Sequence, residues 1–184
     1  DLYRQALAAR PDYLHISNIP GDATFDLPKS LVDPELLDTV IDRLRYSDNA
    51  ETDVETLALL GGFYQLSGDA PAAVTACLES LKVESGKTDL ETALSLALSL
   101  ALAYLDLHDF DAAVGVLSDA VARHPDNARL LNHLGGAQRH ASNFDAAIDS
   151  FQQASRPEFL VAMVNLGSML REARRYDDAI KVLQ

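Results

Sequence analysis

Small, apolar and polar positions recur along much of this chain at a nearly constant period. Each period carries a small residue inside an apolar stretch, an aromatic residue nine positions later and an alanine three positions after that. Gly135, Phe144 and Ala147 form one copy, and Gly167, Tyr176 and Ala179 form another 32 residues later. Ala101, Phe110 and Ala113 form a third copy, 34 residues before the first of these. An earlier copy keeps Gly61 and Ala73 without the aromatic. A period of this size is typical of a stacked-repeat protein.

Each period contains two apolar series at helical spacing, separated by a polar turn. Leu131, Leu134 and Gly135 belong to the first series, and the second follows the turn at 141–143. Each unit is therefore predicted to be two helices joined by a turn. The small residues suit points where two helices cross closely, since they add no bulk there.

A short polar residue stands just before each second apolar series. These residues are Asp69, Asp109 and Asn143, and Pro71 follows Asp69 by two positions. A side-chain oxygen at such a position can accept a hydrogen bond from an amide of the first helical turn. Proline also fits a first turn, so the second helices are predicted to begin here.

This pattern resembles the tetratricopeptide repeat (TPR) family, whose unit of about 34 residues is a helix-turn-helix. The best copy spans 94–127 and carries Ala97, Leu100, Ala101, Tyr104, Phe110, Ala113, Leu117, Ala120 and Pro125. Further copies span 54–88, 128–158 and 160–184, the last of them truncated. The resemblance implies an all-α fold, a right-handed α-solenoid of helix-turn-helix repeats, or TPR-like superhelix.

The remaining segments are less regular. Residues 1–12 match the end of a second repeat helix in their spacing, so we expect the chain to be a piece of a longer array. Residues 13–53 contain Pro20, Gly21, Pro28 and Pro34, which interrupt any long helix. This segment is either a degenerate repeat or an insertion that packs on the solenoid, with a helix predicted near 34–46.

Composition fits a largely helical chain that buries a core, with 48% apolar and 23% charged residues. Cys77 is the single cysteine, so a buried structural thiol is expected and no disulfide framework is possible. The compartment is not determined, although one cysteine slightly favours the cytoplasm. The uncharged run Thr92–Leu105 has 14 residues, fewer than the roughly 20 that span a bilayer, so no membrane insertion is expected.

Charge is distributed unevenly. Residues 1–120 hold 7 Lys and Arg against 21 Asp and Glu, a net of −14, whereas 121–184 hold 8 against 7, a net of +1. The acidic part repels nucleic acid and anionic lipid, so neither is an expected partner. It is either a solvated exterior or a surface that steers a basic partner.

No catalytic, cofactor or metal site is predicted. Gly86, Lys87 and Thr88 end like a phosphate-binding loop, but Leu81 stands where the first glycine is needed. His133 and His140 lie seven residues apart on one helix face, which is too far for both to hold one metal ion. No motif supports an enzyme.

The resemblance implies that first helices of successive repeats line a groove for a peptide or helix of a partner protein. Helical geometry predicts its lining, which changes from apolar to basic: Ser95, Leu98, Leu102, Leu105, Arg129, Asn132, Gly136, Arg139, His140, Val161, Val164, Ser168 and Arg171. Ala58 and Gly62 stand where the family's acidic-tail pocket needs lysine and asparagine, so chaperone-tail binding is not predicted. Asn165 matches one position of the asparagine series that holds extended peptides in some members, but His133 and Ser99 occupy the equivalent positions in the other repeats, so the series is not predicted here.

Three functions follow as hypotheses. The first is a non-catalytic protein-interaction scaffold whose partner segment carries apolar and acidic residues. The second is a regulatory or substrate-recruiting arm of a larger enzyme, such as a glycosyltransferase or sulfotransferase. The third is homotypic assembly, or self-association through the open helical ends.

Overall fold

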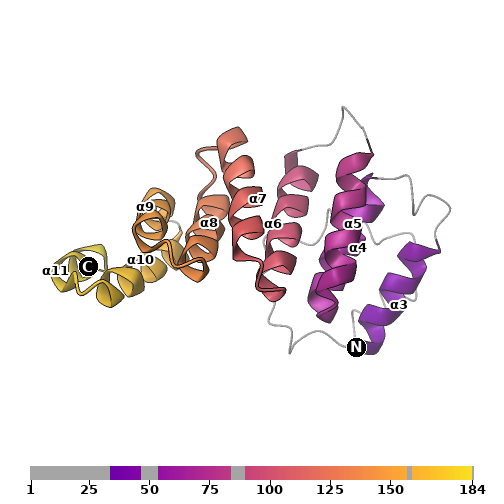
Figure 1. The fold of residues 1–184 in the computed structure, drawn as a ribbon, viewed down its shortest axis with the longest axis horizontal. Coiled ribbons are helices and arrows are strands. Elements are labelled where there is room, and N and C mark those ends of the chain that lie inside the picture. Colours follow the sequence, from indigo (N-terminus) through magenta and orange to yellow (C-terminus); the bar gives the residue numbers. More distant parts are fainter. Residues whose placement is uncertain (1–33, 47–53, 84–89, 157–158, 184) are drawn as a thin grey trace. The chain divides into compact units, whose positions relative to one another are not determined.

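The computed structural model describes residues 34–46, 54–83, 90–156 and 159–183, and all regular structure within these ranges is α-helical (Figure 1). The helices are α3 (Pro34–Arg45), α4 (Val54–Ser67), α5 (Ala70–Lys82), α6 (Leu90–Asp106), α7 (Phe110–Arg123), α8 (Ala128–His140), α9 (Phe144–Ala154), α10 (Leu160–Glu172) and α11 (Tyr176–Leu183). The prediction of an all-α fold is confirmed. The predictions for 1–33 and for the loop at 84–89 lie outside the described residues.

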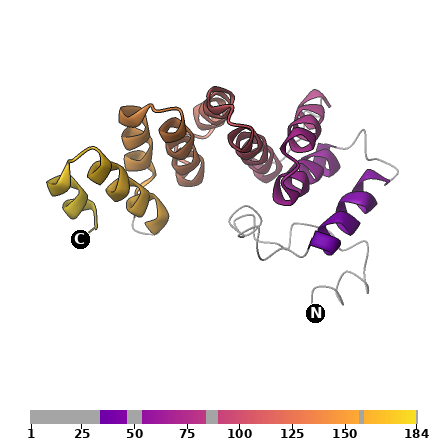
Figure 2. The same ribbon diagram turned by 60° about the horizontal axis from the view of Figure 1, so that its bottom comes forward.

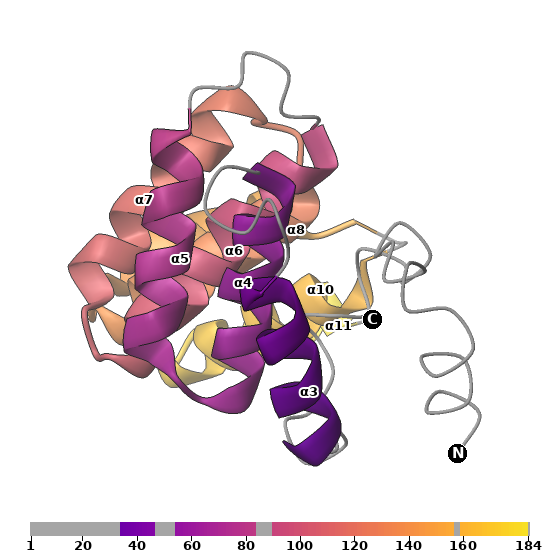
Figure 3. The same cartoon turned by 90° about the vertical axis from the view of Figure 1, so that its right-hand side faces the viewer.

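The chain divides into two compact units, Asp1–Ser99 and Leu100–Gln184. In the first unit α4 and α5 form a helical hairpin, and α3 packs against α4 (Figure 3). Leu37, Val40 and Ile41 of α3 join Leu60 and Phe63 of α4 in one buried cluster. The segment before the first clear repeat thus contributes a helix to the core of that unit.

In the second unit successive helices pack in chain order from α7 to α11, as the hairpins at the yellow and orange end of Figure 2 show. Ile148 and Phe151 of α9 share a buried cluster with Leu166 and Leu170 of α10 and with Ala179 of α11. One repeat therefore closes its core against the next, as an α-solenoid requires.

The turn between the two helices of a repeat has one conformation in four repeats. Gly68, His108, Ser142 and Arg174 have φ of 85°, 59°, 63° and 59°. The amide of the next residue donates to the carbonyl five positions back: Asp69 to Tyr64 at 2.9 Å, Asp109 to Tyr104 at 2.9 Å, Asn143 to Gln138 at 2.8 Å and Arg175 to Leu170 at 2.8 Å. This Schellman geometry satisfies the last carbonyls of each first helix and reverses the chain.

The predicted caps are confirmed in two repeats and wrong in a third. The carboxylates of Asp69 and Asp109 accept from the amides of Ala72 and Ala112, both at 3.1 Å. Asn143 occupies the same position before α9, but its side chain makes no capping bond. Asn127, before α8, makes one instead and accepts from the amide of Leu130 at 3.0 Å.

Glycine permits the close helix crossings that the pattern predicts. A Cβ on Gly61 would overlap the Sγ of Cys77 in α5, and one on Gly135 would lie 2.8 Å from the Phe151 ring in α9. Burial raises the pKa of the Cys77 thiol to about 12, as expected for a thiol enclosed by apolar side chains.

No helix within the described ranges meets the length and hydropathy needed to cross a bilayer.

The shared turn predicts opposite effects for one substitution at two places. Ser142→Gly should raise the free energy of unfolding by up to about 1 kcal/mol, because glycine tolerates a positive φ. Ser118→Gly, at an exposed site inside α7, should lower it by roughly 0.5 kcal/mol. Urea unfolding followed by circular dichroism measures both, and shifts of the same sign would contradict the assignment.

The crossing of α4 and α5 predicts a coupled pair. Gly61→Ala should destabilise the protein by about 1–3 kcal/mol, because Cys77 is buried in a packed core and has little room to move. Cys77→Ala removes the obstructing sulfur, so the double variant should lose less stability than the sum of the two single changes. Gly136→Ala is the control: its Cβ would meet nothing within 4 Å, so it should be neutral or stabilising by up to about 1 kcal/mol. Additive losses in the cycle would refute the contact.

Candidate functional site

The first helices of the last two repeats, α8 and α10, each have one face that does not enter the core. The buried side of α8 carries Leu130, Leu131 and Leu134, and that of α10 carries Leu166 and Leu170. Residues at helical spacing on the other side share one surface. We call this surface the α8–α10 face; it consists of Asn132, Gly136 and Arg139 of α8 and Leu160, Val161, Val164, Asn165, Ser168, Arg171 and Glu172 of α10.

Two polar contacts link α8 to α10 across this face. Asn165 Nδ2 donates to Asn132 Oδ1 at 2.9 Å, and Arg139 Nη2 donates to Glu172 Oε1 at 3.0 Å. The partners in both pairs are 33 residues apart, so the same sequence offset aligns α8 with α10 at both contacts. The face is therefore a continuous surface built from two repeats.

The start of α10 contributes the apolar part of the α8–α10 face. Leu160, Val161 and Val164 are 65%, 57% and 56% exposed. On α8, a Cβ added to Gly136 would meet no atom within 4 Å, so open space lies above the helix backbone there. Apolar groups at the start of α10 and accessible backbone on α8 thus belong to one surface.

The prediction for α6 is wrong at Leu98, which is 1% exposed and cannot meet a partner. Leu98, Ser99, Leu100 and Ala101 are all buried, and four successive residues cover a full helical turn. This part of α6 is enclosed all round. The other predicted lining residues of α6, Ser95, Leu102 and Leu105, are half-buried.

His140 is also placed differently from the prediction. Its ring stacks on Phe110 of α7, with ring centroids 5.5 Å apart and an angle of 21° between the planes. His108 meets the same phenyl ring edge-on at 5.7 Å. His140 therefore faces the second helix of the preceding repeat, because the last turn of α8 brings it beside the start of α7. No group of three metal-ligating side chains occurs among the described residues.

The predicted cationic lining is reduced to a few groups. Arg129 is half-buried, whereas Arg139 and Arg171 are exposed. Arg139 is ion-paired with Glu172, and no ion pair is present for Arg171 within the described ranges. Val161 and Val164 are exposed as predicted, and Asn132 and Ser168 are half-buried. The face therefore ends at one ion pair and one exposed arginine.

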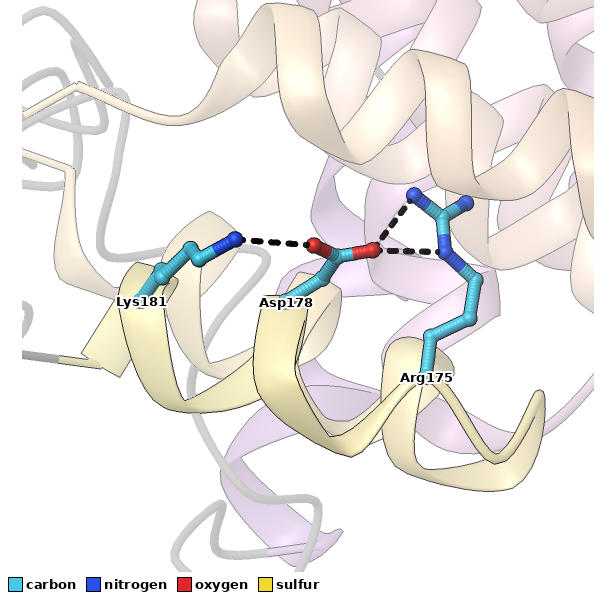
Figure 4. Close-up of polar contacts among 3 residues, drawn as sticks. All are labelled: Arg175, Asp178 and Lys181. Atoms are coloured by element: carbon cyan, nitrogen blue, oxygen red, sulfur yellow. Dashed lines mark hydrogen bonds and ion pairs between the residues drawn. The ribbon is translucent and has the colours of Figure 1, made fainter.

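A second ion-pair group lies just beyond this face, at the start of α11 (Figure 4). Asp178 accepts from Nε and Nη2 of Arg175 at 2.9 Å each, and Lys181 Nζ lies 3.6 Å from its other oxygen. The hydrogen bond from Arg175 lowers the pKa of Asp178 below its ordinary value of 3.8, and the nearby positive charges lower it further. Asp178 thus partly neutralises Arg175, which directly precedes α11, and Lys181.

Comparison with known sequences agrees with the repeated pattern. Residues 98–158 and 162–184 each match a sequence profile described as tetratricopeptide repeat. Over these residues the chain consists of tetratricopeptide repeats. The matched residues include all of α8 and α10 from residue 162 onward, so the α8–α10 face is formed largely by first helices of the matched repeats.

Solved structures of the protein MamA are similar to this chain in fold. MamA 41-end from Desulfovibrio magneticus RS-1 is 22% identical with a TM-score of 0.65, over 82% of this chain and 90% of that one. Another MamA structure is 22% identical with a TM-score of 0.67, over 81% and 80%. MamA AMB-1 is 22% identical with a TM-score of 0.60, over 89% and 92%. No curated protein sequence shows significant similarity to the chain.

Sequence reasoning missed both polar links. The repeat spacing of 32 places His133 opposite Asn165, whereas the amide that binds Asn165 belongs to Asn132. Glu172 was not predicted, although a carboxylate in the last turn of a helix is unfavourably placed in the helix dipole and so deserves a partner. The sequence did offer one signal for this ion pair: Glu172 lies 33 positions after Arg139, close to the repeat period.

The contacts of Asp178 predict the direction of a pKa change. Arg175→Gln should raise the pKa of Asp178 toward 3.8, since it removes the main hydrogen bond to the ionised form. The stability that this pairing contributes is present above the ordinary pKa and is lost as the pH falls through the lowered one. Side-chain carboxyl NMR titration measures the shift.

Lys181→Gln is the matched control for Asp178, because its amine is farther away at 3.6 Å. It should raise the pKa by less than Arg175→Gln does. An equal or larger effect of Lys181→Gln would contradict the geometry.

Proposed function

We propose that this chain is a non-catalytic protein-interaction module whose α8–α10 face binds an extended or helical segment of a partner protein. The exposed apolar side chains at the start of α10 carry the proposal, because they adjoin a paired amide and an arginine on one surface. The tetratricopeptide repeats that it contains support a binding role.

The exposed apolar residues of α10 favour binding, because a partner that covers them removes apolar surface from water. Leu160, Val161 and Val164 lie on one side of α10 and keep more than half of their surface in solvent. Contiguous apolar surface on a repeat protein marks an interaction site more often than isolated residues do. Covering these three side chains would contribute roughly 1 kcal/mol each.

The amide pair supplies hydrogen bonds beside that apolar surface. Asn165 uses its Nδ2 toward Asn132, so its carbonyl oxygen and the amino group of Asn132 keep further hydrogen-bonding capacity. These groups match the N–H and C=O of a peptide main chain. Because each amide orients the other, less rotamer freedom is lost when a partner binds.

Self-association is a second candidate function, and the exposed apolar side chains of α11 favour it. Tyr176 and Ile180, on one side of α11, are exposed. Covering them with a second copy would remove apolar surface from water, whereas the net charge of −13 on each copy opposes association at low salt. Light scattering at several protein and salt concentrations would detect an assembly that strengthens as salt is added.

The test of the proposed function is selection of peptides from a random 12-residue display library on the immobilised full chain. We expect peptides whose binding is lost in the Val161→Asp/Val164→Asp double variant, since charge replaces the apolar contact. Leu81→Asp is the matched control, because Leu81 is equally exposed but lies on α5. Peptides that bind the double variant and the parent protein equally well would refute this site.

A further inference from the structure

The ion pair between Arg139 and Glu172 lies where a partner would meet the α8–α10 face. Arg139 is on α8 and Glu172 ends α10, and their side chains are 50% and 41% exposed. Glu172 follows Arg171 directly, and Arg171 is seven residues after Val164 on the same helix. The acidic oxygen of Glu172 therefore occupies the cationic end of a surface that is apolar at its other end.

We propose that Glu172 is a built-in competitor for Arg139, displaced when a carboxylate of the partner segment binds there. This inference rests on the proposed function, because it specifies the chemistry of the segment that the α8–α10 face accepts. The occupant is a peptide segment with an apolar side chain at one end and an aspartate or glutamate at the other.

The contact is suited to displacement. Glu172 receives one hydrogen bond from one guanidinium nitrogen, Nη2, at 3.0 Å. Exposed ion pairs of this kind contribute little to stability, because water screens both charges. A carboxylate that binds two guanidinium nitrogens at once makes a stronger contact than a single hydrogen bond. A partner can therefore replace Glu172 at small cost.

Arg171 adds to the charge that an incoming carboxylate meets. It is exposed, and the structure shows no ion pair for it within the described residues. Arg175 and Lys181 are held by Asp178 on α11 (Figure 4). When the Glu172 side chain is displaced, Arg139 and Arg171 remain at this end of the face, and their positive charges favour an acidic group of the partner.

Helix geometry fixes the spacing of the two groups in the partner. Val164 and Arg171 are separated by seven residues, which is about 10 Å along a helix. An extended peptide covers that distance in about three residues. A helical peptide needs about seven residues. The selected segments should therefore carry an apolar and an acidic residue about three positions apart if they are extended, or about seven if they are helical.

The test uses a 12-residue peptide from the selection, with affinity measured by fluorescence polarisation. Glu172→Gln should bind it about 2- to 5-fold more tightly, because the internal competitor is gone. Arg139→Gln should bind it more weakly. Asp149→Asn is the matched control: it removes the same charge at an exposed site on α9 and should change affinity less than Glu172→Gln does.

The outcomes separate this inference from the proposed function. If binding is lost in the Val161→Asp/Val164→Asp variant but Glu172→Gln is no tighter than Asp149→Asn, the α8–α10 face is a binding site and the competitor role is wrong. Selected peptides without an acidic residue would also overturn it. If the selection yields no peptide that depends on Val161 and Val164, both proposals fail.

Discussion

The close approach of the two helices within a repeat is the constraint on which the rest of this structure depends. Gly61 lies against Cys77, and Gly135 lies against the Phe151 ring, at distances that leave no room for a Cβ. A larger residue would separate the pair and move every later helix with it, because each repeat packs mainly on its neighbours. The register that joins Asn132 to Asn165 and Arg139 to Glu172 follows from this spacing.

The fold could be predicted from the sequence because its signals are local and repeated. Asp69 and Asp109 predicted helix starts from the chemistry of one side chain and one amide, and the structure has both bonds. The left-handed (αL) backbone of His108, Ser142 and Arg174 is harder to predict from residue type, since glycine occupies that turn position only at Gly68. At the three non-glycine positions the place of the residue in the repeat decides the conformation, and the residue's own preference does not.

The candidate face was harder to predict, because exposure depends on what surrounds a helix as well as on its period. The pattern assigned Leu98 and Val164 to equivalent surfaces, yet Leu98 is buried and Val164 is exposed. His140 was predicted to line the same groove as Arg139, but its ring stacks on Phe110 of α7. Contacts between side chains of different repeats, such as that of Arg139 with Glu172, are not encoded in the period of any single repeat.

The enclosed thiol of Cys77 gives this protein a natural reporter of local motion. Its pKa of about 12 and its burial mean that an alkylating reagent at neutral pH reaches it as a thiolate mainly when α4 and α5 separate. Because it is the single cysteine in the chain, the labelling rate reports the opening of this one hairpin. The separation of α4 and α5 can therefore be measured in the unaltered protein, independently of partner binding at the α8–α10 face.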